Sequence, residues 1–111
     1  MDLIPSPAHR LAADLARLVA ILDEAGRWLH ADEIRRLEPR LCARRVRQLA
    51  EAAEGEIISC TSRGYRLTRH ATPDEVRHSL ADLRSRAKKL LSRYAATSRA
   101  WHSSAHHQPR P

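Results

Sequence analysis

The chain has 111 residues, of which 42% are hydrophobic and 30% charged, with a net charge of +7, and this fits one small domain with a modest core. It has no run of about 18 apolar residues and no apolar leader near its start, so we expect no membrane span and a cytoplasmic location. The two cysteines, Cys42 and Cys60, lack a Cys-x-x-Cys spacing, which argues against a zinc ribbon and predicts two buried or half-buried thiols.

A first helix is predicted over residues 7–25. Ser6 is placed to cap it, Pro7 suits its first position, and Gly26 suits the left-handed backbone that commonly ends a helix. Apolar residues recur at spacings of three and four, so one face of this helix should be buried. The residues on that face are Leu11, Leu15, Leu18, Val19 and Leu22.

A short second helix is predicted over residues 31–37. Either His30 or Asp32 can cap it, and the helical spacing predicts that Ile34 and Leu37 are buried.

After a turn at residues 38–39, a third helix is predicted over residues 40–53, with Gly55 as its stop signal. Its apolar face consists of Cys42, Val46, Leu49, Ala50 and Ala53. The opposite face carries Arg44, Arg47, Gln48 and Glu51, with Arg45 on the flank. This helix is therefore expected to present basic side chains outward.

A β-hairpin is predicted over residues 56–68. Its strands contain β-branched, aromatic and aliphatic residues, and the intervening turn at residues 62–64 includes Gly64, which can adopt a positive φ. The residues that suit the strands are Ile57, Ile58, Tyr65 and Leu67.

A long last helix is predicted over residues 73–97. Thr72, Pro73 and Glu75 form a complete capping box at its start. Apolar residues then recur in alternating steps of four and three, the spacing of a coiled coil. This apolar seam consists of Val76, Leu80, Leu83, Ala87, Leu90 and Tyr94. Part of the seam is expected to pack on the first helix, and the rest to pair with a second copy of the chain.

These elements predict a domain over residues 1–71, a C-terminal helix that dimerises over residues 72–101, and a disordered tail over residues 102–111.

The tail histidines have no acidic or thiol partner nearby, so no metal site is expected. No catalytic arrangement and no phosphate-binding glycine loop is visible, so we expect a protein that is not an enzyme and needs no cofactor. The tail histidines are His102, His106 and His107.

The positive charge is unevenly distributed. Residues 1–75 hold 12 basic and 12 acidic side chains, whereas residues 76–111 hold 8 basic and 1 acidic. Within the first part, residues 39–70 hold 7 basic against 3 acidic side chains. Basic charge thus concentrates in the third helix, the hairpin and the last helix, which predicts a polyanionic partner.

The segment from Ile34 to Leu67 resembles the winged helix-turn-helix superfamily, in particular small regulatory proteins of phages and bacteria. The matching residues are Glu33-Ile34, Arg44 to Leu49, Gly55, Ile57-Ile58 and Gly64 to Leu67. The resemblance implies a mainly α fold with a small β-hairpin, called the wing, and here with a long C-terminal helix. It also implies that residues 27–30 pair with the wing as a minor third strand, with Trp28 packing beneath it.

In this superfamily the third helix enters the major groove and the wing touches the adjacent backbone. Guanidinium and carboxamide groups can pair with guanine and adenine, so the residues expected to contact bases are Arg44, Arg45 and Gln48. The residues expected to contact phosphates are Arg40, Arg47, Ser62, Arg63 and Arg66, joined by Lys88 and Lys89 of the last helix.

The sequence therefore predicts a double-stranded DNA-binding protein, a transcriptional regulator or phage accessory factor, that acts as a homodimer. Its two third helices would lie about 34–36 Å apart and favour an inverted repeat. One alternative is a winged helix that binds protein, for instance an inhibitor docking on an acidic surface of a nucleic-acid enzyme. Another is an architectural DNA binder without sequence preference.

Overall fold

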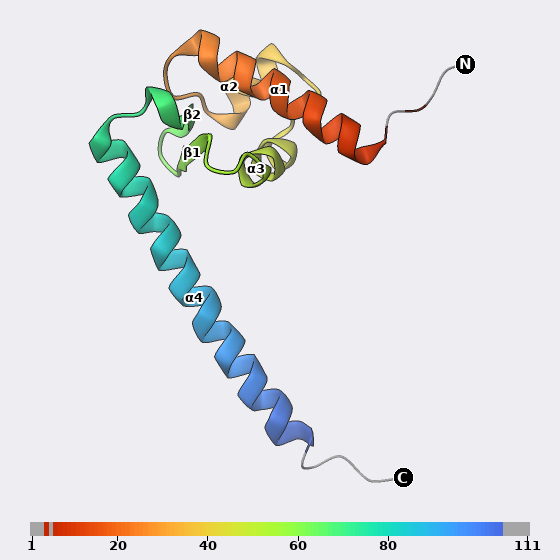
Figure 1. Cartoon of the computed structure of the whole chain (residues 1–111), viewed down its shortest axis with the longest axis vertical. Coiled ribbons are helices and arrows are strands. Elements are labelled where there is room, and N and C mark those ends of the chain that lie inside the picture. Colours follow the sequence, from red (N-terminus) through yellow and green to blue (C-terminus); the bar gives the residue numbers. More distant parts are fainter. Residues whose placement is uncertain (1–3, 5, 106–111) are drawn as a thin grey trace. The chain divides into compact units, whose positions relative to one another are not determined.

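The computed structural model describes residue 4 and residues 6–105. The chain divides into two units, Met1–Ser79 and Leu80–Pro111. In chain order the elements are α1 (Pro7–Ala25), α2 (Ala31–Leu37), α3 (Ala43–Ala52), β1 (Ile57–Cys60), β2 (Gly64–Leu67), a short 3₁₀ turn (Thr68–His70) and α4 (Pro73–Ala105) (Figure 1). The expectation of a mainly helical fold with one small hairpin is confirmed.

Helix α1 has the ends that its sequence predicts. The Ser6 Oγ accepts a hydrogen bond from the backbone N–H of His9 at 3.1 Å, and Pro7 occupies the first turn. Gly26 ends the helix in the left-handed conformation at φ 62°, and its N–H donates to the Leu22 carbonyl. The apolar face packs into the core through Leu18 and Leu22, which are almost fully buried.

Two burial predictions near the turn after α2 are wrong. Leu37 is 59% exposed, because the chain turns at residues 38–41 and Leu41 enters the core in its place. Helix α3 begins at Ala43 rather than at residue 40, because Cys42 is its extended N-cap at φ −68° and ψ 165°. Cys42 is therefore exposed, contrary to its predicted place on the buried face, whereas Cys60 is half-buried as expected.

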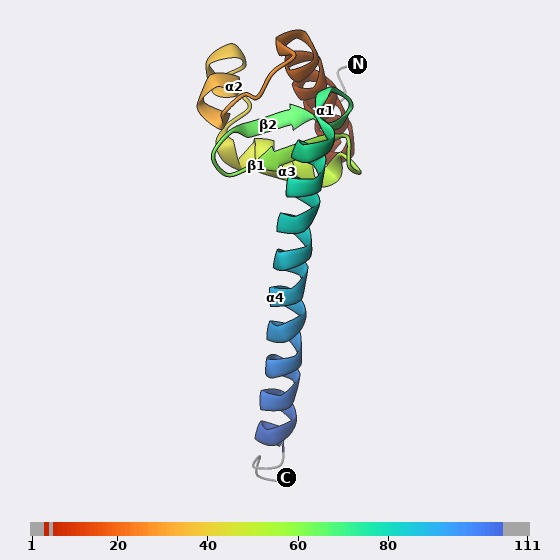
Figure 2. The same cartoon turned by 90° about the vertical axis from the view of Figure 1, so that its left-hand side faces the viewer.

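The wing is a two-stranded antiparallel sheet, with Ile57 opposite Leu67 and Cys60 opposite Gly64. The predicted third strand is present as a single bridge: Leu29 and Tyr65 exchange two backbone hydrogen bonds of 2.8 and 2.9 Å. Figure 2 shows the two strands of the wing running side by side.

One core joins these elements in the first unit. Its most buried side chains come from α1, the Leu29 bridge, α2, the turn after it, α3 and the wing. They are Leu18, Leu22, Leu29, Ile34, Leu41, Val46, Leu49 and Leu67. Because α3 is anchored from one side only, its opposite face remains exposed.

Helix α4 begins with the capping box that the sequence predicts. The N–H of Glu75 donates to Thr72 Oγ1 at 3.2 Å, and the N–H of Thr72 donates to Glu75 Oε1 at 2.8 Å. The helix spans 33 residues to Ala105, so its predicted end at residue 97 is wrong. Residues 102–105 are helical rather than disordered, and residues 106–111 of the predicted tail lie outside the described part of the chain.

The apolar seam lies mostly in the second unit. Val76, in the first unit, is half-buried, whereas the larger seam side chains beyond it are at least 52% exposed. Within the described residues, no helix combines the length and hydropathy needed to cross a membrane.

Candidate nucleic-acid interface

Helix α3 presents a basic outer face. Val46 and Leu49 are completely buried and hold the helix on the core, while Arg44, Arg47 and Gln48 are exposed. Within the described residues, Arg44 and Arg47 form no ion pair. Two exposed guanidinium groups that form no ion pair favour an anionic partner.

Arg45 lies between this face and the core. Its Nε donates to Asp14 Oδ2 of α1 at 2.9 Å, and its Nη1 donates to Gln48 Oε1 at 3.3 Å. Its side chain is only 26% exposed and that of Asp14 only 16%. Arg45 therefore links α3 to α1 and orients the carboxamide of Gln48, so any contact between Arg45 and a base would require it to leave Asp14.

Arg40 lies in the turn before α3 and is 70% exposed. Its Nε donates to Glu38 Oε1 at 3.2 Å, and this hydrogen bond is the main reason that the pKa of Glu38 is lowered. Nη2 of Arg40 also lies 4.0 Å from Asp14. Exposed pairs of this kind contribute about 0–1 kcal/mol, so Arg40 can exchange its carboxylate partner for a phosphate.

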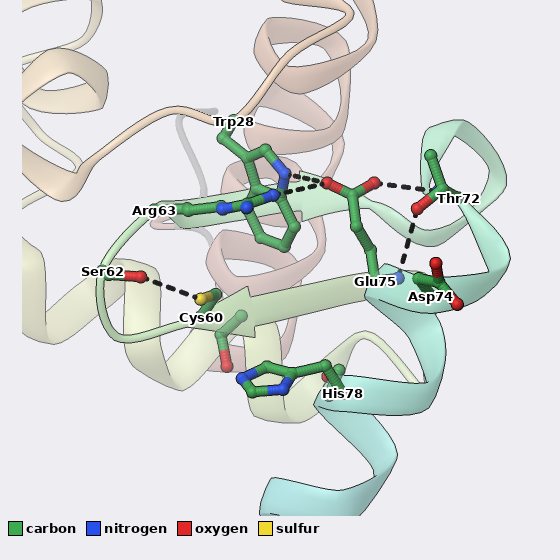
Figure 3. Close-up of a pocket in the computed structure, with 10 residues that line it drawn as sticks. Trp28, Cys60, Ser62, Arg63, Thr72, Asp74, Glu75 and His78 are labelled. Atoms are coloured by element: carbon green, nitrogen blue, oxygen red, sulfur yellow. Dashed lines mark hydrogen bonds and ion pairs between the residues drawn. The ribbon is translucent and has the colours of Figure 1, made fainter.

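The wing arginines converge on one carboxylate, Glu75 of α4. Nη1 of Arg63 lies 3.2 Å from Glu75 Oε2 (Figure 3). Nη1 of Arg66 lies 3.4 Å from Glu75 Oε1. Arg66 is 20% exposed and also donates to the Gly26 carbonyl at 3.0 Å, whereas Arg63 is 59% exposed. Because it is largely exposed, Arg63 can exchange Glu75 for a ligand, with Ser62 exposed beside it. Arg66 holds the wing to the start of α4 and to Gly26.

Glu75 also accepts a hydrogen bond from the indole N–H of Trp28. The backbone N–H of Thr72 and this indole N–H are the main groups that lower the pKa of Glu75 to about 2. One carboxylate thus joins the bridge segment, the wing and the start of α4. The sequence reveals Glu75 only as a helix cap, and Trp28, predicted simply to pack beneath the wing, also acts as a hydrogen-bond donor.

Replacement of Glu75 by glutamine is expected to lower stability in a pH-dependent way. Because the pKa of Glu75 is depressed on folding, its contribution is present above pH 4.5 and is lost as the pH falls toward 2. Urea unfolding at pH 7 and pH 3 should show the larger difference between the wild type and Glu75→Gln at pH 7. Glu51→Gln, at an exposed carboxylate, is the control, and equal effects of the two variants would contradict this role.

A pocket of about 500 Å³ lies beside this network in the first unit. Cys60 lines it, and a hydrogen bond with the Ser62 hydroxyl, at 3.4 Å, lowers the pKa of the Cys60 thiol. Among residues 4 and 6–105, no three histidine, cysteine or acidic side chains gather as a metal site. The other lining residues are Trp28, Ser59, Arg63, Thr72, Asp74, Glu75, His78 and Ser79.

The lysines predicted to contact phosphates on the last helix, Lys88 and Lys89, lie in the second unit. Both side chains are exposed, and neither forms an ion pair with another residue that the structure describes. They remain available to a polyanion.

Comparison with known proteins found no match among protein-family models, curated proteins or solved structures.

Proposed function

We propose that the chain is a double-stranded DNA-binding protein of winged helix-turn-helix architecture, acting as a transcriptional regulator or phage accessory factor and not as an enzyme. The order of elements supports this proposal: α1, a bridge strand at Leu29, α2, α3 and then the hairpin. The single observation that carries it is the outer face of α3, where Arg44 and Arg47 are exposed and form no ion pair among the described residues.

Arg44 and Gln48 are the proposed readers of base edges. They are four residues apart in the first six residues of α3 and therefore share one face. The N-terminal residues of a recognition helix are those that reach bases. Arg44 can pair with guanine and Gln48 with adenine. Arg45 positions the carboxamide of Gln48 for base recognition. The residues proposed to contact phosphates are Arg47, Arg40 and Arg63.

Selection from a pool of random duplexes tests this function directly. The wild type is expected to enrich a defined sequence, and Arg44→Ala with Gln48→Ala to reduce affinity for it by about 100-fold, since each base contact contributes about 1–3 kcal/mol. The double variant should bind unrelated duplex nearly as the wild type does.

Arg99→Ala, which removes an equal charge from an exposed site in α4, is the control and should keep the selected sequence. Binding of all duplexes alike would support an architectural role. Absence of duplex binding would overturn the proposal and favour the protein-binding alternative.

The wing tip and α4 are expected to add affinity that does not depend on sequence. Removing charge at Arg63, Lys88 and Lys89 should weaken binding to all duplexes alike, because these residues are proposed to neutralise phosphates. The slope of log K against log salt should flatten by about 0.9 for each phosphate that the variant no longer neutralises. An unchanged slope in fluorescence anisotropy titrations would contradict these phosphate contacts. Arg66 is left intact because it also braces the wing.

A further inference from the structure

Helix α4 presents an exposed apolar stripe in the second unit, interrupted at Thr97. Leu80, Leu83, Leu90 and Tyr94 of the apolar seam are 52–74% exposed, and Trp101, one heptad beyond Tyr94, is 63% exposed. Because the helix continues to Ala105, the repeat from Leu80 to Trp101 covers about three heptads, the length at which a heptad pattern indicates a coiled coil.

We propose that α4 pairs with α4 of a second copy of the chain as a parallel, in-register two-stranded coiled coil. This inference goes beyond DNA binding and does not depend on it. In the heptad frame the positions named a hold Leu80, Ala87 and Tyr94, and those named d hold Leu83 and Leu90. These are the positions whose side chains interlock between two helices.

The charged positions beside the stripe determine the orientation. In a parallel pair each g residue faces the e residue five places later on the partner helix. Arg86 then faces Leu91, and Arg93 faces Ser98, so no two arginines meet. Leu91 is 67% exposed in the single chain, and the aliphatic part of Arg86 can cover it.

An antiparallel pair brings like charges together. In that arrangement g faces g and e faces e, and the seam fits in two registers. In one register Arg86 meets Arg86 and Arg84 meets Arg84 of the other copy; in the other register Arg86 meets Arg93. Like charges placed opposite each other are destabilising, so the parallel arrangement is favoured.

Few acidic residues are present in this part of α4 to neutralise the arginines beside the stripe. From Leu80 onward α4 contains one acidic residue, Asp82, whereas basic residues recur along the same stretch. Arginines at the flanking positions therefore have no acid across the interface in either orientation. The two α4 helices therefore favour the parallel orientation, because it keeps their arginines apart.

A cysteine cross-link tests the arrangement on the whole chain. Thr97 occupies the next d position and is exposed, so in a parallel pair the two copies of residue 97 face each other at disulfide distance. Thr97→Cys, made with Cys42→Ser and Cys60→Ser, is expected to oxidise to a covalent dimer of about 25 kDa, twice the mass of one chain. Ser92→Cys in the same background lies on the outer side of α4 and should stay uncrosslinked.

Sedimentation of the uncrosslinked protein completes the test. A dimer that also cross-links through residue 97 supports the proposal. A dimer that does not cross-link through Thr97→Cys alone overturns it, whether or not a mixture of Leu80→Cys and Thr97→Cys chains cross-links. A chain that stays monomeric at about 100 µM also overturns it and directs the search to an acidic partner helix. Circular dichroism confirms that each variant is folded.

Discussion

Replacement of Gly64 by alanine is expected to lower the free energy of unfolding by about 3 kcal/mol or more. Gly64 has a φ of 101°, and a Cβ atom on it would lie 2.2 Å from the carbonyl oxygen of Leu29. That oxygen accepts the N–H of Tyr65 in the bridge between the third strand and the wing. A methyl group at this point must therefore separate Leu29 from the wing or distort both backbones.

The loss is large for a chain of this size, because small domains have about 5–15 kcal/mol of stability in total. Urea unfolding followed by circular dichroism measures it. Gly55→Ala is the matched control, because Gly55 also has a positive φ, 89°, but no atom lies within 4 Å of its added Cβ. The control should lose about 1–2 kcal/mol, the cost of an unfavourable φ alone. Equal losses in the two variants would show that the contact with Leu29 is not the cause.

The features predicted correctly from the sequence are those set by local chemistry. Ser6 and Gly26 define α1, and Thr72 with Glu75 defines the start of α4, because capping groups bond within a few residues. The hairpin is also local, since Gly64 supplies the positive φ that its turn requires. Such signals can be read without knowledge of the rest of the fold.

Two burial errors lie at the helix ends that border the turn after α2. Leu37 and Cys42 both fit an apolar periodicity, yet the chain reverses between them and Leu41 takes the buried place. Periodicity describes one helix at a time and does not reveal where a turn resets it. A single misplaced turn therefore accounts for both errors.

The candidate site was predicted less completely than the fold, because its contacts are distant in sequence. Arg45 bonds to Asp14, 31 residues away, and Trp28 bonds to Glu75, 47 residues away. From residue type alone, both Arg45 and Arg66 are predicted to contact DNA. The structure shows that Arg45 and Arg66 pair with acidic residues of other elements and so stabilise the fold. Arg44 and Arg47 have no such ion pair in the part of the chain that the structure describes.

On the proposed DNA-binding function and coiled-coil dimer, disruption of the seam is expected to weaken DNA binding by about 100-fold or more. Leu83→Glu with Leu90→Glu places carboxylates at two d positions of the proposed coiled coil, where two copies would bury four like charges. Each chain should then become a folded monomer with a single α3 to offer to DNA. Joining two binding modules commonly raises affinity by about 10²–10⁴-fold, and the monomer loses that gain.

The control is a second double variant that adds the same negative charge to α4 outside the seam. Ser85→Glu with Ser92→Glu introduces the same two carboxylates on the outer side of α4, where both serines are exposed. This variant should remain a dimer and bind DNA with only a modest loss. Sedimentation, circular dichroism and anisotropy on an inverted repeat and on a single half-site separate the outcomes. The seam variant should bind both DNAs equally, whereas the wild type should prefer the inverted repeat. A seam variant that unfolds would show that these leucines complete the protein's own core, and a folded dimer would show that α4 is not the dimer interface.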